Sequence, residues 1–270
     1  MLAGGELHGM WWVNEAKWFP HRVRQRLNAG VFGARRVGVG GQRRQHDAER
    51  VRAPAAQAAR PRMRGVVQLP GRLGLWHVGV PPTGPMDERY LPHANRLVGN
   101  NDHTAALELT VSGPVLKFFS DIVIALAGAV MPMKLDGVEL PHNRAVQVKA
   151  GQTLAIGSIT GAGQRAYLAV SGGFDAPLVM GSRATFGLGQ FGGNATGTLR
   201  AGHVLRLARR NQTDILLATD PAELTREWSV GVLYGPHGAP DFFLEEDIET
   251  LFSTPYEVHF NSARTGVRLI

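Results

Sequence analysis

The chain has 270 residues, with 29 Lys and Arg against 22 Asp and Glu, and no Cys. That length permits one large domain or two small ones, and the absence of Cys excludes disulfide bonds and metal sites built on thiolates. The absence of Cys also fits a reducing compartment, and we expect a cytoplasmic protein. No apolar run approaches the roughly 20 residues that a membrane-spanning helix requires, so we expect no membrane partner.

The basic charge is concentrated in residues 1–65, which hold 13 of the 29 Lys and Arg but only 4 of the 22 acids. Apolar residues in this head follow neither a strand nor a helix period, and the composition favours disorder over a fold. We interpret the head as disordered or mis-translated, from a wrong start or reading frame. A nucleic-acid-binding arm or a transit peptide would need a binding module or an amphipathic helix, so we expect no nucleic-acid partner. Residues 66–270 are then the folded domain.

Residues 77–87 carry three Pro and two Gly in eleven positions. Each Pro fixes its own φ and removes a backbone donor, and each Gly permits turns that are costly for other residues. The segment therefore predicts a stiff, bent loop that presents its own backbone groups.

A helix is expected over residues 88–98, directly after this loop. Asp87 is the predicted N-cap, because its carboxylate can accept from unpaired backbone amides, and Gly99 is the predicted stop. Pro92 would lie too deep in a helix that began at residue 88, so the helix either starts later or bends there.

The following region, up to residue 217, contains short apolar segments separated by turn residues, which predicts a mainly β fold with minor helix, as a barrel or a sandwich. The predicted strands are residues 115–119, 122–127, 131–135, 138–140, 145–148, 153–156, 165–170, 204–207 and 215–217. Asp136-Gly137 predicts a tight hairpin. Residues 181–202 are rich in Gly but do not join a strand to a helix, so they predict a surface loop or a mobile loop against a partner domain.

A second motif block lies near the end, where residues 234–243 read Tyr-Gly-Pro-His-Gly-Ala-Pro-Asp-Phe-Phe. A second helix is expected from about Leu244, because three acids follow at once and favour the positive end of the helix dipole. Residues 257–260 predict a strand that leads into a loop over residues 261–266.

Three contiguous stretches carry a family resemblance: residues 77–87, 94–100 (Ala-Asn-Arg-Leu-Val-Gly-Asn) and 106–114 (Ala-Leu-Glu-Leu-Thr-Val-Ser-Gly-Pro). They resemble the biotin-dependent carboxyltransferase family once called allophanate hydrolase subunit 2, over residues 67–270. The resemblance implies cyclophilin-like β-barrel subdomains and a domain truncated at its C-terminal end. The Pro-His-Gly-Ala-Pro-Asp-Phe-Phe form of residues 236–243 is most similar to the carboxyltransferase domain of urea carboxylase (urea amidolyase).

The resemblance implies transfer of CO2 from carboxybiotin, on a separate carrier domain, to urea or guanidine, giving allophanate from urea. It also implies three partners: a companion carboxyltransferase half similar to allophanate hydrolase subunit 1, a biotin carboxylase, which alone uses ATP, and a biotin carrier. Three alternatives remain open. The chain could be a component of an ATP-dependent 5-oxoprolinase, a Kip-type regulatory binding module without activity, or an inactive remnant.

Candidate site residues follow from what the reaction needs. Urea offers two NH2 groups and one carbonyl, so a pocket for it wants a carboxylate and a donor. Asp241 is the expected acceptor, Asn261 and Arg264 are expected donors, and His237 could donate or relay a proton. The alternatives are a helix N-cap for Asp241, a turn role for His237 and Asn261, and an ion pair with the acidic helix for Arg264.

The resemblance also suggests that part of the Pro-rich loop lines the entrance for biotin. The expected residues are Pro82, Thr83, Gly84 and Met86. The alternative is a structural bend packed under the barrel. Glu108 and Asn95 are expected to be buried polar supports, and no cluster at metal-ligand spacing surrounds His77, so no metal is expected.

Overall fold

The structure is a computed structural model that describes residues 55–58, 64–68, 71–193, 197–208, 224–232, 235–259, 262 and 266–270. The chain divides into two compact units, a larger one within Arg35–Arg226 and a smaller one that includes Glu227–Ile270. Each unit is described by itself below. Within the described residues, no helix is long and apolar enough to cross a bilayer.

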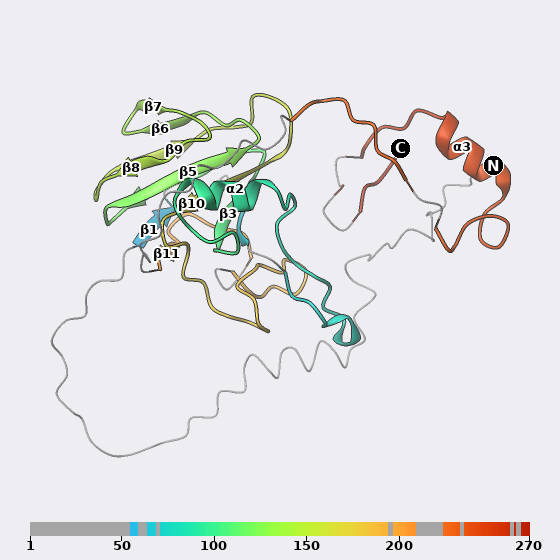
Figure 1. The fold of residues 1–270 in the computed structure, drawn as a ribbon, viewed down its shortest axis with the longest axis horizontal. Helices are drawn as coiled ribbons and strands as arrows, with labels where there is room; N and C mark the ends of the chain where they lie inside the picture. Colours follow the sequence, from blue (N-terminus) through green and yellow to red (C-terminus); the bar gives the residue numbers. More distant parts are fainter. Residues whose placement is uncertain are drawn as a thin grey trace, which may run out of the picture. The chain divides into compact units, whose positions relative to one another are not determined.

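The described part of the larger unit contains two antiparallel sheets, a 3₁₀ turn and one α-helix (Figure 1). Its helical elements are η1, a 3₁₀ turn at Trp76–Val78, and α2 at Tyr90–Leu97. Its strands are β1 (Ala55–Ala58), β2 (Arg64–Gln68), β3 (Ala106–Thr110), β4 (Val115–Phe118), β5 (Ile122–Gly128), β6 (Met133–Leu135), β7 (Val138–Leu140), β8 (Val146–Val148), β9 (Thr153–Ile156), β10 (Arg165–Val170) and β11 (Val204–Arg206). One sheet has the order β11-β1-β4-β9-β6-β7 and the other the order β2-β3-β10-β5-β8. The expectation of a mainly β fold with minor helix is confirmed.

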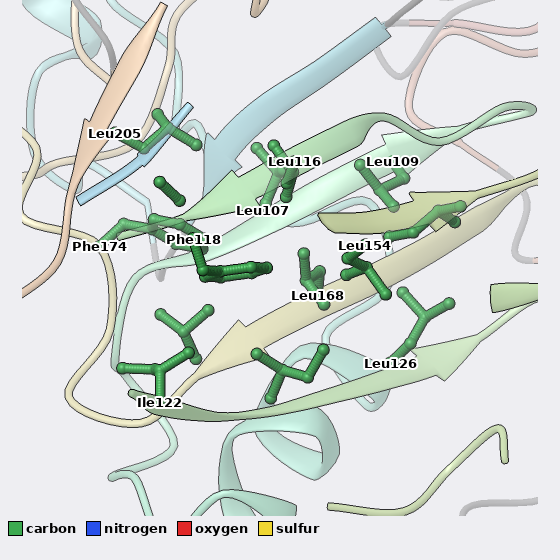
Figure 2. Close-up of a cluster of buried hydrophobic side chains, with 14 of the residues drawn as sticks. Leu107, Leu109, Leu116, Phe118, Ile122, Leu126, Leu154, Leu168, Phe174 and Leu205 are labelled. Atoms are coloured by element: carbon green, nitrogen blue, oxygen red, sulfur yellow. The ribbon is translucent and has the colours of Figure 1, made fainter. Parts of the chain in front are cut away.

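The main hydrophobic core draws side chains from both sheets (Figure 2). The six-stranded sheet contributes Leu116 and Phe118 of β4 and Leu154 of β9, and the five-stranded sheet contributes Leu126 of β5 and Leu168 of β10. All five are almost completely buried. Because apolar burial is the dominant favourable term in folding, this shared core holds the two sheets together.

The five-stranded sheet is buried on both faces, which explains why β5 is apolar without alternation. Its Ile124 and Leu126 belong to the main core, whereas Ala125 and Ala127 join a second cluster beneath α2. Small residues on this second face let the helix approach the strands closely. The helix in turn positions the loop that precedes it in the chain.

Helix α2 begins at Tyr90, two residues later than predicted, and ends at Leu97. Pro92 is therefore its third residue, in the first turn, where a backbone N–H would have no intrahelical partner. The later of the two predicted starts is correct. The hairpin predicted at Asp136-Gly137 joins β6 to β7, with both residues at positive φ, 49° and 90°.

Strand β1 lies within the segment that the composition assigned to the basic head. It pairs with β4 on one side and β11 on the other, and Ala56 and Ala58 are buried in the main core. Residues 55–58 therefore contribute to the fold of the larger unit. In the head, residues 1–54 and 59–63 lie outside the described residues. The strand predicted at 215–217 lies outside them as well.

The smaller unit contains helix α3 at Glu245–Ser253 and a short antiparallel pairing near the end of the chain. The Glu257 and Ile270 backbones exchange hydrogen bonds at 3.2 and 2.8 Å, and the His259 amide donates to the Arg268 carbonyl at 2.9 Å. The helix after Leu244 and the extended chain at 257–259 both agree with the predictions made from the sequence. The described residues of this unit are all partly or largely exposed.

Candidate functional site

The Pro-rich segment forms an irregular loop of the larger unit between η1 and α2. Gly79 closes η1 with a left-handed backbone, at φ 76°, and its amide donates to the Trp76 carbonyl. No strand or further helix interrupts the described chain between Val78 and Tyr90. The bent loop expected from the three Pro is therefore present.

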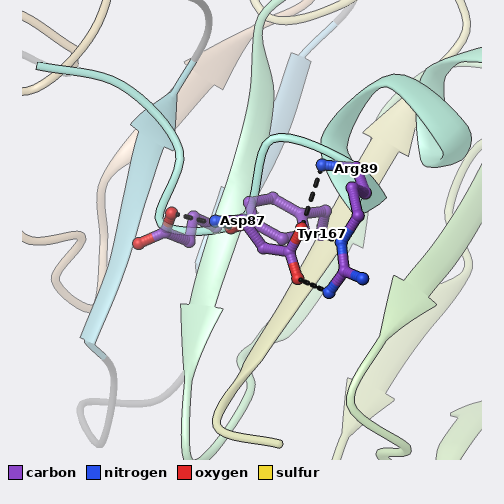
Figure 3. Close-up of polar contacts among 4 residues, drawn as sticks. Asp87, Arg89 and Tyr167 are labelled. Carbon is purple, nitrogen blue, oxygen red and sulfur yellow. Dashed lines mark hydrogen bonds and ion pairs between the residues drawn. The ribbon is translucent and has the colours of Figure 1, made fainter. Parts of the chain in front are cut away.

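The end of this loop is anchored to the sheet by two buried side chains, Glu108 of β3 and Tyr167 of β10. The strand register places these residues directly opposite each other, and neither is exposed. Glu108 Oε2 accepts the Met86 amide at 2.7 Å and the Tyr167 hydroxyl at 3.1 Å. The Tyr167 oxygen accepts the Asp87 amide at 2.7 Å (Figure 3). Two consecutive loop amides thus have partners on the sheet, which fixes the path of the chain.

The electrostatics of this anchor keep the Tyr167 phenol protonated. Burial raises the pKa of Tyr167 above its ordinary value, and the nearby Glu108 carboxylate raises it further. The phenol therefore retains the proton that it donates to Glu108. Arg165 Nε lies 3.7 Å from the other carboxylate oxygen, Glu108 Oε1, and supplies positive charge to a fully buried group. The expectation that Glu108 is a buried polar support agrees with this arrangement.

Asp87 does not cap α2, so the N-cap prediction for it is wrong. The N-cap position is Arg89, whose own side chain makes no capping hydrogen bond. Asp87 Oδ1 instead accepts the Arg89 amide at 2.9 Å, two residues on, and Asp87 Oδ2 lies 3.1 Å from Arg89 Nη2 (Figure 3). A carboxylate that accepts from the amide two positions later forms a local turn, which leads the chain from the loop into the helix.

A second anchor, the guanidinium of Arg72, holds the middle of the loop. Arg72 is only 2% exposed, and its Nη1 donates to Thr83 Oγ1 at 2.8 Å. Its Nε donates to the Val179 carbonyl at 3.0 Å, and its Nη2 donates to the Ser182 carbonyl at 3.3 Å. The centre of the Phe191 ring lies 5.0 Å from the guanidinium carbon. Burial lowers the pKa of Arg72 from its ordinary value.

The loop also lies directly against the chain beside Arg72. A Cβ atom on Gly71 would lie 1.4 Å from the Thr83 carbonyl oxygen, which no side chain could accommodate. Thr83 is therefore held by Gly71 through its backbone and by Arg72 through its hydroxyl. The two anchors, one at Thr83 and one at Met86 and Asp87, bracket the residues in between.

The four residues expected to line the biotin entrance all lie in this anchored stretch. Pro82 and Met86 are exposed, with Met86 at 48%, whereas Thr83 and Gly84 are half-buried. The loop thus offers an apolar surface beside a hydroxyl group. Its role in binding biotin stays a prediction.

His237 and Asp241 lie together in one tight turn of the smaller unit. The Phe242 amide donates to the Gly238 carbonyl at 3.0 Å, and the Ala239-Pro240 peptide is cis. The His237 ring meets the Phe242 ring edge to face, with centres 4.7 Å apart and planes at 86°. This contact orients the imidazole on the outside of the turn.

Asp241 is exposed and is not the N-cap of α3, so that alternative is wrong. The N-cap is Leu244, and the carboxylate that accepts its amide, at 3.0 Å, belongs to Asp247. Helix capping therefore does not explain an Asp at position 241, and the catalytic role of Asp241 stays a prediction. Asn261 and Arg264 lie outside the described residues.

Among the described residues, no three His, Cys, Asp or Glu side chains gather as they would around a metal ion. The geometry instead offers an anchored loop with apolar and hydroxyl groups in one unit, and a turn with an imidazole and a carboxylate in the other.

A protein-family model described as "Carboxyltransferase domain, subdomain A and B" matches residues 78–270, which is most of the chain. The chain belongs to this carboxyltransferase family. The urea amidolyase of Saccharomyces cerevisiae is 46% identical over 214 residues, which cover 76% of this chain and 12% of that protein. The crystal structure of the Kluyveromyces lactis urea carboxylase superposes with a TM-score of 0.71 at 41% identity, over 81% of this chain and 20% of that one.

Another relative is a 5-oxoprolinase subunit of Escherichia coli, 32% identical over 203 residues, which cover 75% of this chain and 64% of that protein. The carboxyltransferase chain thus spans about an eighth of the length of the amidolyase and about two thirds of that of the 5-oxoprolinase subunit. The structural likeness to the urea carboxylase confirms the fold implied by the motifs.

Two residues that organise the carboxyltransferase loop, Arg72 and Tyr167, were not singled out from the sequence. Tyr167 lies in a strand of apolar residues, where the sequence predicts that an aromatic ring packs in the hydrophobic core. Arg72 follows Gly71 in a segment without periodicity. A weak signal for the first anchor exists in Glu108, a charged residue within the apolar strand Ala106–Thr110, because a buried charge requires partners.

Proposed function

We propose that this chain forms part of the carboxyltransferase site of a urea carboxylase, which transfers CO2 from carboxybiotin to urea and gives allophanate. The observation that carries the proposal is the double anchoring of the Pro-rich loop. Glu108 and Tyr167 hold its end, Arg72 holds Thr83, and the surface left open consists of Pro82 and Met86. Enzymes gain rate when the groups that meet the reactants are fixed in advance, and this loop is built in that way.

The loop residues fit the ureido ring of biotin, which is flat and partly apolar. Pro82 and Met86 would contact its face, and Thr83 and Gly84 would offer polar groups to its edge. When bound, biotin supplies the carboxyl group, so the electronically difficult part of the chemistry belongs to the cofactor. The protein has to orient the ring and keep water away from the reacting carbon.

The turn around Asp241 fits the acceptor, urea. The exposed carboxylate has no hydrogen-bond partner among the described residues, so it can accept from the NH2 groups of urea. His237, oriented by Phe242, would donate to the urea carbonyl or relay a proton. We propose Asn261 and Arg264 as further donors from the loop that follows His259.

The reaction requires parts that the chain does not supply. We propose a companion carboxyltransferase half, a biotin carboxylase that uses ATP, and a biotin carrier domain as partners. Relatives called urea amidolyase are about eight times as long as the matched stretch, which leaves room for such parts in one polypeptide. Residues 66–270 would form the carboxyltransferase part, with β1 added to it.

Guanidine remains a possible substrate, because its NH2 groups also suit a carboxylate. It is a cation without a carbonyl, so binding that depends on Asp241 but not on His237 favours guanidine. 5-Oxoproline is the substrate class suggested by the relative named as a 5-oxoprolinase subunit. A Kip-type module would bind its partner without turnover. Calorimetric titration of the assembled protein with urea, guanidine and 5-oxoproline separates these alternatives.

The proposal is tested by Asp241→Asn in the chain reconstituted with its companion half, biotin carboxylase and carrier. We expect allophanate formation to fall at least tenfold, because an amide cannot replace the carboxylate toward two NH2 groups. Carboxylation of the carrier should be unchanged, since it occurs at a different site. Glu249→Gln, which removes the same charge from an exposed position on α3, is the matched control. Equal transfer by the Asp241 variant and the control would remove Asp241 from the site.

A further inference from the structure

Arg72 is a buried cation, and the described groups that contact it are neutral. Its three hydrogen bonds go to the Thr83 hydroxyl and to the carbonyls of Val179 and Ser182, and its flat face meets the Phe191 ring. Among the residues that the structure describes, no carboxylate lies within ion-pairing distance of it. Arginine does not lose its proton in proteins, so the described residues around this site surround a buried positive charge without a carboxylate to balance it.

The contacts of Arg72 connect three stretches of chain. Val179 and Ser182 pair with each other across a tight turn, in which Met180 and Gly181 have positive φ of 50° and 76°. Both carbonyls at the base of this turn accept from Arg72. The remaining donor, Nη1, reaches Thr83 Oγ1 and so extends from this framework to the Pro-rich loop.

The contact with Arg72 determines how Thr83 can act. A hydroxyl group has one proton and two lone pairs, and Arg72 can only donate. Thr83 Oγ1 must therefore accept from the guanidinium, and its own proton must point elsewhere. Thr83 is half-buried, and no other hydrogen bond of its hydroxyl occurs within the described part of the chain. The hydroxyl is thus set as a donor whose strength is increased by the adjacent positive charge.

We propose that Arg72 is a positioning residue that presents the Thr83 hydroxyl as a charge-assisted hydrogen-bond donor to the carbonyl oxygen of a ureido ring. This inference rests on the proposed function and deepens it, because the ureido oxygen gains negative charge when the ring gives up its carboxyl group. A fixed donor aimed at an oxygen that becomes more negative stabilises the transition state more than the ground state. Arg72 acts through Thr83 and does not touch the ligand.

The test measures binding of 2-imidazolidinone, which is the ureido ring alone, and of biotin methyl ester to the full 270-residue chain by ligand-observed NMR titration. Thr83→Ser keeps the hydroxyl and should bind both probes within about twofold of the unchanged chain. Thr83→Val keeps the shape without the hydroxyl and should bind about tenfold more weakly, as the loss of one hydrogen bond from a polarised donor predicts. The infrared carbonyl stretch of bound 2-imidazolidinone should move to lower wavenumber with Thr or Ser, and not with Val.

Arg72→Lys completes the experiment as a double-mutant cycle with Thr83→Val. Lys keeps the charge but lacks the planar fork that spans three acceptors, so Arg72→Lys should weaken probe binding when Thr83 is present. In the Thr83→Val background, which already lacks the hydroxyl, Arg72→Lys should cause no further loss of affinity. If the Lys variant does not fold, the Ser and Val pair still decides whether the Thr83 hydroxyl is the donor to the ureido oxygen. Equal binding by Thr83→Ser and Thr83→Val, or no binding of either probe by the unchanged chain, would overturn the inference.

Failure of the proposed function would look different. Suppose that probe binding depends on the Thr83 hydroxyl but the reconstituted complex transfers no carboxyl group to urea. That result would support the donor role of Thr83. It would reject urea as the acceptor.

Discussion

The anchor beneath the Pro-rich loop predicts a large effect for the removal of one oxygen atom. Tyr167→Phe keeps the ring in the cluster under α2 but removes the hydroxyl that donates to Glu108 and accepts from the Asp87 amide. A hydrogen bond to a charged group contributes about 1.5–3 kcal/mol and a neutral one about 0.5–1.5 kcal/mol. Glu108 is fully buried, so water cannot replace the lost donor. We expect a loss of about 2–4 kcal/mol in the free energy of unfolding.

Two measurements check this magnitude. For a folded unit of roughly 150–250 residues, the melting temperature should fall by about 5–15 °C, as followed by circular dichroism. Hydrogen exchange of the Met86 and Asp87 amides, followed by mass spectrometry, should accelerate roughly 30-fold or more, because opening of the loop then breaks fewer contacts. Tyr256→Phe is the control, since its hydroxyl is 3.4 Å from the Thr250 carbonyl and partly exposed to solvent. Unchanged melting and unchanged protection of both amides in Tyr167→Phe would refute the anchoring.

Two further predictions concern stability of the larger unit. Burial lowers the pKa of His142 below its ordinary 6.5, so the unfolded chain binds a proton that the folded chain does not, and the free energy of unfolding should fall below pH 6.5 at a limiting rate of about 1.4 kcal/mol per pH unit. Melting curves from pH 5 to 8 should show this dependence, with a smaller slope in His142→Gln; equal slopes would contradict it. Gly113→Ala should cost about 1–3 kcal/mol, because the new Cβ would lie 2.3 Å from Ile156 Cγ2. Gly161→Ala, where nothing lies within 4 Å, should change stability by less than about 0.5 kcal/mol, and equal melting of the two variants would count against close packing at Gly113.

Local patterns predicted most of the regular elements. The strands at Thr153–Ile156 and Arg165–Val170 and the hairpin at Asp136-Gly137 follow directly from apolar runs bounded by turn residues. Strand β1 was missed because Ala-Ala-Gln-Ala has little β propensity, and its place in the sheet depends on pairing with β4 and β11. The N-cap prediction for Asp87 is wrong because a cap directly before a predicted helix start cannot be distinguished, from sequence alone, from a turn residue three positions before the actual start at Tyr90.

The amino-acid sequence by itself determined the family, through the resemblance of its contiguous motifs. It also determined the mainly β class and the location of the Pro-rich loop, because Pro, Gly and apolar spacing act on neighbouring residues. The tertiary structure alone decided what holds that loop. Glu108 and Tyr167 are 59 positions apart, and Arg72 reaches chain more than 100 positions away. Such contacts exist only after distant parts of the chain have come together in the folded unit, since a charge or a phenol in the sequence does not specify the partner that will make its burial favourable.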